Sequence, residues 1–152
     1  MVAWRQVQTD APDFAARVQE RFDAGTNKTM ATIRKDGSPR ISGTELQFRD
    51  GRITLGMMPA SRKLDDVHRD PRVALHSPTL EPPPGPPSLW AGDAKISGRL
   101  VGTGPIEGEP PDGVFFEVDL DEVVLTYVDD TNVHLVIESW HADRGWSRHT
   151  RT

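Results

Sequence analysis

The most informative chemistry in the sequence lies in residues 57–63, where Arg62 and Lys63 stand side by side after Ser61, at the predicted start of a short helix. The first turn of a helix carries free backbone N–H groups and the positive end of the helix dipole, so it favours an anion. Two cations oppose that dipole unless a bound anion compensates them. Arginine offers a bidentate fork, lysine a point charge and serine one further donor. The segment therefore predicts a phosphate site; a solvated pair of surface cations is the alternative reading of this feature alone.

Other kinds of reactive site find little support in the sequence. There is no cysteine, which excludes disulfides, thiolate nucleophiles and Cys-ligated metals. No two of the five histidines have the spacing of a helical metal site, so no metal is expected. The neighbouring acids Asp65 and Asp66 are interpreted as ordinary solvated charge. No catalytic residue is assigned, which fits a protein whose chemistry belongs to a bound coenzyme.

Short strands and two helices are expected to position the cationic segment. A helix is predicted to open at Asp10-Ala11-Pro12 and end at Gly25, with Asp10 as its cap and an apolar stripe at every fourth residue. Strands are predicted over 30–34, 39–48 and 52–58, forming a three-stranded meander whose last two strands join at an Asp50-Gly51 hairpin. The cationic helix then begins at Ser61 and stops at Asp70-Pro71.

The rest of the chain also reads as β-structure. Further strands are predicted over 72–76, 94–101 and 114–128, the last as one bent strand or two, followed by a final hairpin over 134–140 and 145–151. The proline-rich residues 80–88 are expected to form a long surface loop. Many short strands without alternating βαβ units predict a mainly β barrel or sandwich.

Composition limits the partners and the location. The 152 residues suit one domain spanning 1–152, and the net charge of -5 argues against nucleic acid as a partner. No apolar run is long enough to cross a bilayer, and the first residues lack a signal-peptide layout. We therefore expect a cytoplasmic protein with no membrane partner.

A series of short motifs resembles one known family. Pro39-Arg40-Ile41-Ser42, the Asp50-Gly51 hairpin, Ser61-Arg62-Lys63 and Asp70-Pro71-Arg72-Val73-Ala74-Leu75 follow one another as in the pyridoxamine 5'-phosphate oxidase-like split-barrel flavoproteins. The resemblance covers 29–77 and returns weakly at 94–101 and 137–151. It implies a six-stranded antiparallel Greek-key split β-barrel with two or more short helices. It also implies a homodimer with two FMN sites at the subunit interface.

The resemblance further implies a set of coenzyme-binding residues. In that family the Arg and Lys of Ser-Arg-Lys bind the flavin phosphate, the Arg before the second strand lies near it, and strand backbone contacts the ring. The endings Ile-Glu-Ser-Trp and His-Thr-Arg are similar to the oxidases' Ile-Glu-Phe-Trp and His-Asp-Arg, which would bring two residues from the partner subunit. The implied residues are Arg40, Ser42, Gly43, Thr44, Leu55, Gly56, Met57, Ser61, Arg62, Lys63, Trp140 and Arg151.

Departures from the family limit the expected function. Ser147 stands where the oxidases carry an Arg for pyridoxal phosphate, and no Tyr and Arg substrate segment follows Val101. We therefore expect an FMN-binding oxidoreductase that acts on a small molecule but is not a true pyridoxamine phosphate oxidase. The alternatives are a reductase that uses the deazaflavin coenzyme F-420, a non-catalytic FMN-binding or carrier protein, and a barrel that has lost its coenzyme. The substrate and the electron donor have no signature in the sequence.

Overall fold

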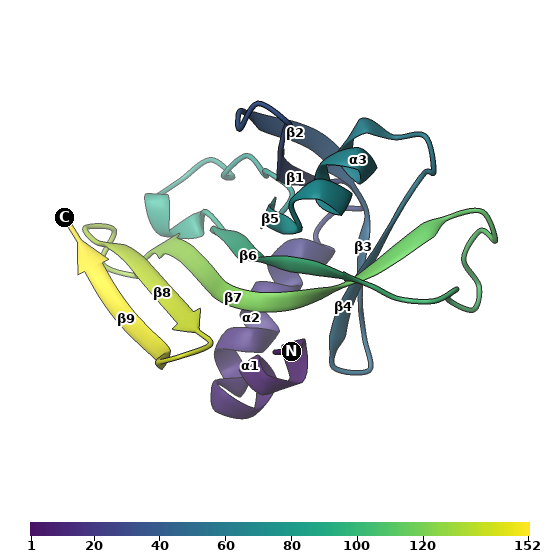
Figure 1. Cartoon of the computed structure of the whole chain (residues 1–152). Helices are drawn as coiled ribbons and strands as arrows, with labels where there is room; N and C mark the ends of the chain where they lie inside the picture. Colours follow the sequence, from purple (N-terminus) through teal and green to yellow (C-terminus); the bar gives the residue numbers. More distant parts are fainter.

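The chain forms nine strands and three α-helices in a computed structural model that describes residues 1–152 (Figure 1). The helices are α1 (Trp4–Asp10), α2 (Pro12–Asp23) and α3 (Arg62–Arg69), with a short 3-10 turn η1 (Pro87–Leu89). The strands are β1 (Lys28–Ile33), β2 (Pro39–Thr44), β3 (Leu46–Arg49), β4 (Arg52–Met57), β5 (Arg72–His76), β6 (Asp93–Gly102), β7 (Val114–Val128), β8 (Leu135–His141) and β9 (Gly145–Arg151).

All strand pairs are antiparallel, in the order β2-β1-β5-β6-β7-β4-β3, with β8 on β7 and β9 on β8. The 15-residue strand β7 organises the sheet, because it pairs with β6 along most of its length, with β4 at its start and with β8 at its end. The register between β6 and β7 shifts after Ser97. A Cβ on Gly98 would lie 2.1 Å from the Asp119 carbonyl oxygen, so glycine permits the close approach at this bend.

The mainly β, antiparallel split-barrel class with short helices is confirmed, and the predicted bent strand is the single continuous strand β7. The resemblance implies six strands, whereas the structure has nine. Strands β2 and β3 lie at the two ends of the order and do not pair with each other, so the sheet stays open. The predicted meander is wrong. Its second strand is divided at Glu45 into β2, which pairs with β1, and β3, which pairs with β4.

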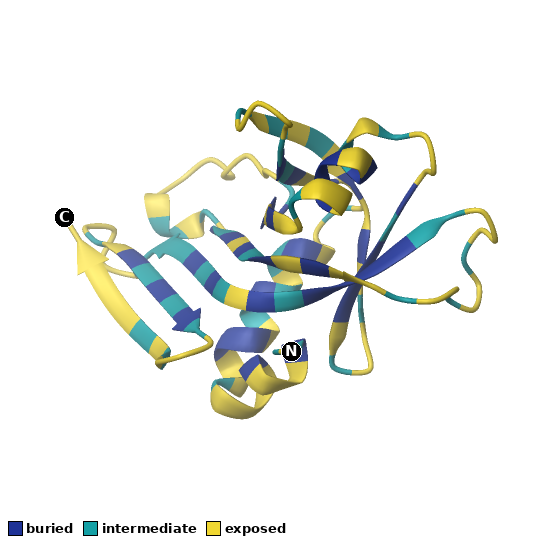
Figure 2. Ribbon diagram, viewed as in Figure 1, coloured by how far each residue is buried: buried dark blue, intermediate teal, exposed yellow.

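Helices α1 and α2 pack beneath the sheet and close one side of the core. Phe14, Val18 and Phe22 are all buried, which confirms the predicted stripe, and Figure 2 shows the buried positions along the strands and on the covered sides of these helices. Asp10 does not cap a helix, because α2 begins after Ala11 without a side-chain cap. Its carboxylate instead accepts a hydrogen bond of 3.0 Å from the Trp140 indole N–H.

Helix α3 follows β4 and lies against β1, with Leu64 and Val67 buried beneath it. It begins after Ser61 and ends before Asp70, as the sequence predicts. None of the helices has the length and apolar character needed to cross a lipid bilayer.

Candidate functional site

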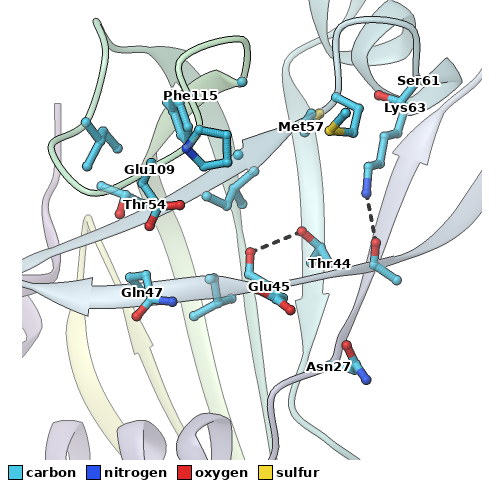
Figure 3. A pocket seen from close by; sticks show the side chains of 18 residues that line it. Asn27, Thr44, Glu45, Gln47, Thr54, Met57, Ser61, Lys63, Glu109 and Phe115 are labelled. Atoms are coloured by element: carbon cyan, nitrogen blue, oxygen red, sulfur yellow. Dashed lines mark hydrogen bonds between the residues drawn. The ribbon is translucent and has the colours of Figure 1, made fainter.

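A cleft of about 580 Å³ opens between the β2–β4 segment and the loop that joins β6 to β7. Strands β2, β3 and β4 supply one wall, which includes the backbone of residues 54–57. The loop supplies the opposite wall with Ile106, Glu109 and Pro110, next to the Phe115 ring (Figure 3). The cleft is thus a mixed polar and apolar site of the size that cofactors occupy.

A second pocket of about 430 Å³ adjoins the cleft, because Gly43, Ser61 and Lys63 line both. We call it the anion pocket. It has four basic side chains and no acidic one, and its lining is Arg34, Arg40, Ile41, Ser42, Gly43, Ser61, Arg62 and Lys63. The Lys63 ammonium donates a hydrogen bond of 2.8 Å to the Gly43 carbonyl oxygen, which places it where the two pockets meet (Figure 3).

The N-terminus of α3 brings unused hydrogen-bond donors to this junction. Ser61 is the N-cap residue in an extended conformation, yet its side chain makes no cap bond, and its hydroxyl oxygen is buried without a partner. The N–H groups of Arg62 and Lys63 belong to the first turn, where no intrahelical acceptor exists. Arg62 is exposed and makes no ion pair with the protein. These donors fit a phosphate, which would satisfy the orphaned Ser61 hydroxyl as well.

A buried carboxylate supports the anion pocket from behind. Asp66 is only 2% exposed and accepts hydrogen bonds from Thr32 Oγ1 at 2.7 Å, Arg40 Nε at 2.7 Å and Arg69 Nη2 at 3.1 Å. Burial opposes the ionisation of Asp66, but these three hydrogen bonds outweigh it and hold its pKa at about 2. The interpretation of Asp66 as solvated charge is therefore wrong, whereas Asp65 is exposed as expected.

The structure gathers ten of the twelve predicted coenzyme residues around the two pockets. Those ten are Arg40, Ser42, Gly43, Thr44, Leu55, Gly56, Met57, Ser61, Arg62 and Lys63. Contact between these residues and a coenzyme stays a prediction.

The two predicted residues near the C-terminus lie outside both pockets. Trp140 is 1% exposed in the core of its own chain and donates to Asp10. Its ring is covered within the single chain, and its expected contact with a coenzyme stays a prediction. Arg151 is exposed at the end of β9, and its expected contact across a subunit interface stays a prediction.

Several lining residues have no motif that would have pointed to them, among them Arg34, Gln47 and Phe115.

A glycine within a strand is a signal for a close approach. This signal is correct at Gly56, where an added Cβ would lie 2.6 Å from the Phe115 ring. At Gly43 an added Cβ would meet nothing within 4 Å. Gly43 therefore leaves its part of the strand open to a ligand.

Comparisons place the fold among known structures. No protein-family model and no curated protein matches the sequence. A pyridoxamine 5'-phosphate oxidase-related, FMN-binding protein from Nostoc punctiforme superposes with a TM-score of 0.64 and 10% identity, over 93% of this chain and 96% of that one. PhzG from Burkholderia lata, in complex with tetrahydrophenazine-1-carboxylic acid, gives a TM-score of 0.61 and 14% identity over 93% and 87%.

A third structure, from Clostridium acetobutylicum, is a protein related to general stress protein 26 and described as of the pyridoxinephosphate oxidase family. It gives a TM-score of 0.62 and 11% identity over 86% of this chain and 96% of that one. The TM-scores establish a common fold, and at identities this low they establish the fold alone. The resemblance read from the sequence motifs is thus confirmed as a likeness of fold to these pyridoxamine 5'-phosphate oxidase-related proteins.

Proposed function

We propose that the chain binds FMN across the two adjoining pockets and acts as a flavin-dependent oxidoreductase. The observation that carries this proposal is the N-terminus of α3, which presents Ser61, Arg62 and Lys63 at the junction of the anion pocket and the cleft. A phosphate dianion would be met there by two cations, by backbone N–H groups and by a hydroxyl without a partner.

The cleft suits the rest of such a coenzyme. Its strand wall includes Gly56 and Met57, which pair with β7 but not with β3, and the side chains of Gln47 and Thr54 add polar contacts. The buried Phe115 ring excludes water from one side. Bound FMN would supply two-electron transfer, and the protein would anchor the phosphate, orient the ring and limit its exposure to water. The fold shared with an FMN-binding protein of Nostoc punctiforme supports this assignment.

The deazaflavin coenzyme F-420 is the second candidate. It also carries a ribityl phosphate, and its side chain has carboxylates beyond that phosphate. Asp66 pairs with Arg40, but Arg34, Arg62 and Lys63 remain without a carboxylate, and their three positive charges are more than one phosphate dianion neutralises. This excess of charge favours a coenzyme with further anionic groups.

The test is a titration of the purified chain with FMN, riboflavin and F-420, followed by absorbance and calorimetry. We expect the affinity for FMN to exceed that for riboflavin by about 100-fold or more, because riboflavin lacks the phosphate that accepts the charge-assisted hydrogen bonds. Equal affinity for FMN and riboflavin would remove the basis of the proposal. Stronger binding of F-420 than of FMN would select the second candidate.

A second measurement separates an enzyme from a carrier. The FMN complex is mixed anaerobically with NADH or NADPH, and then with an acceptor such as a quinone. Bleaching of the flavin absorbance and its return on adding the acceptor are the results expected of an oxidoreductase. Bound FMN that neither donor reduces would point to the carrier, and a chain that takes up no coenzyme would point to a scaffold.

A further inference from the structure

Asp66 joins three elements around the anion pocket without lining the pocket itself. It accepts hydrogen bonds from Thr32 on β1, from Arg40 on β2 and from Arg69 on its own helix. Arg69 also donates to the Ile33 carbonyl oxygen at 2.6 Å, which ties the C-terminal end of α3 to β1. The position of α3, and with it the position of its N-terminus, is therefore fixed to the two strands through one buried carboxylate.

The contact between Asp66 and Arg40 leaves most of the arginine available. Only the Nε of Arg40 is engaged, at 2.7 Å from Asp66, while its two terminal nitrogens have no acceptor in the protein. The Arg40 side chain is 19% exposed and lines the anion pocket together with Arg62 and Lys63. Because the guanidinium is planar, fixing its Nε also fixes the plane in which the remaining four N–H groups lie.

We infer that Asp66 is a positioning residue that sets Arg40 and the start of α3 in the arrangement that receives a phosphate group. This inference rests on the proposed function, since it assigns a role in the binding of the FMN phosphate. The Arg40 guanidinium would lie between two negative groups, the Asp66 carboxylate on the protein side and the phosphate on the pocket side. Asp66 remains ionised at any pH well above about 2, so the arrangement persists under ordinary conditions.

Simple electrostatics predicts the opposite sign, which makes the inference testable. A carboxylate near a phosphate repels it, so removing the charge of Asp66 should strengthen anion binding if Asp66 acts only through space. If Asp66 positions Arg40, removing its charge should weaken binding. Asp65 provides the matched control because it is the preceding residue on the same helix, carries the same charge and is exposed.

The experiment compares Asp66→Asn with Asp65→Asn by titration with FMN and with riboflavin. For Asp66→Asn we expect FMN affinity to fall about tenfold or more, as for loss of one charge-assisted contact to the phosphate. Riboflavin affinity should stay within about twofold, because riboflavin has no phosphate for Arg40 to meet. Asp65→Asn should leave FMN affinity unchanged or slightly higher. Unchanged or stronger FMN binding by Asp66→Asn would overturn the inference.

A double-mutant cycle tests whether Asp66 acts through Arg40. In the Arg40→Ala background, Asp66→Asn should have a much smaller effect on FMN affinity than in the wild type. An equal effect in both backgrounds would overturn the inference that Asp66 positions Arg40.

Arg40→Lys keeps the inference testable if Asp66→Asn fails to fold. A lysine ammonium can pair with Asp66, but it is a point charge on a flexible stem and lacks the planar fork that would hold donors toward the phosphate. We expect Arg40→Lys to lose nearly as much FMN affinity as Arg40→Ala, and wild-type affinity in Arg40→Lys would contradict the inference. A wild type that does not distinguish FMN from riboflavin would overturn the proposed function and this inference together.

Discussion

Arg62 and Lys63 are two cations in the first turn of one helix, and neither has a carboxylate partner. Arg17, Arg40 and Arg72 each pair with an acidic side chain, whereas Arg62 pairs with none and Lys63 donates to a carbonyl oxygen. Cations in the first turn of a helix destabilise that helix in the absence of an anion. A bound phosphate should therefore stabilise α3 as well as be held by it.

At the residue scale, the double variant Arg62→Ala with Lys63→Ala should weaken FMN binding by several kcal/mol. Each charge-assisted hydrogen bond to a phosphate contributes about 1.5–3 kcal/mol, and both donors are removed. Isothermal titration calorimetry measures the loss. The control is Lys95→Ala with Arg49→Ala, which removes the same charge from exposed positions outside both pockets. Equal losses in both double variants would show that only net charge matters.

The residues that sequence could identify are those with a local signature. Ser61, Arg62 and Lys63 are adjacent, so their shared place at a helix start was predictable. Asp66 has no such signature, because its partners Thr32 and Arg40 come from distant strands and the exposed Asp65 beside it is the same residue type. Trp140 matches a motif by residue type, but its hydrogen-bond partner Asp10 lies 130 positions away in the sequence, so its environment was not predictable.

At the scale of elements, a partly buried ion pair ties α2 to the C-terminal hairpin. Glu138 on β8 is 2% exposed and accepts two hydrogen bonds from Arg17, at 2.5 and 2.8 Å, and others from Tyr127 and Trp146. Burial opposes the ionisation of Glu138, but the hydrogen bonds from Arg17 and Tyr127 outweigh it and lower its pKa. Donors from α2, β7 and β9 thus converge on the Glu138 carboxylate, so the position of the hairpin depends on this carboxylate.

Substituting Arg17→Met should lower the free energy of unfolding by about 2–3 kcal/mol, because the buried carboxylate loses its charged partner. Urea denaturation measures the change. Glu138 has a lowered pKa, so the pair stabilises the fold above the ordinary glutamate value near 4.5, and the difference between wild type and variant should shrink as the pH falls below it. The control Arg99→Met breaks a half-exposed pair with Asp121 and should change stability by less than about 1 kcal/mol. A difference that grows on acidification would contradict this assignment.

Most elements were predictable because each is specified locally, by alternation, by a hairpin turn or by a helix stop. The Asp50-Gly51 turn has positive φ at both residues, as its composition predicts. The break at Glu45 was not predictable, because Thr44 and Leu46 are both buried and the alternation runs through the break. The pattern records which side of the strand is buried, but it does not record which neighbour the strand pairs with.

At the scale of the whole molecule, the pockets lie where the sheet is open and where apolar side chains are uncovered. Ile41 is 74% exposed and lines the anion pocket, and Met58 is 62% exposed and lines the cleft. Strands β2 and β3, which border the pockets, also present unpaired edges. Exposed large apolar side chains beside a ligand site are characteristic of surfaces that a ligand or another chain covers.

We predict that the chain sediments as a dimer and that a second copy completes the coenzyme site. Ile41→Lys should shift sedimentation toward the monomer and weaken FMN binding in parallel, because a charge at a buried interface is strongly unfavourable. The new charge is positive and does not repel the phosphate, so a loss of affinity reports on the interface. Leu89→Lys is the matched control, since Leu89 is 49% exposed at the end of η1, away from both pockets. It should leave both the mass and the FMN affinity unchanged. A wild-type monomer that binds FMN tightly would contradict this prediction, because one open barrel would then suffice for coenzyme binding. In that case the coenzyme alone would cover the exposed side chains of Ile41 and Met58.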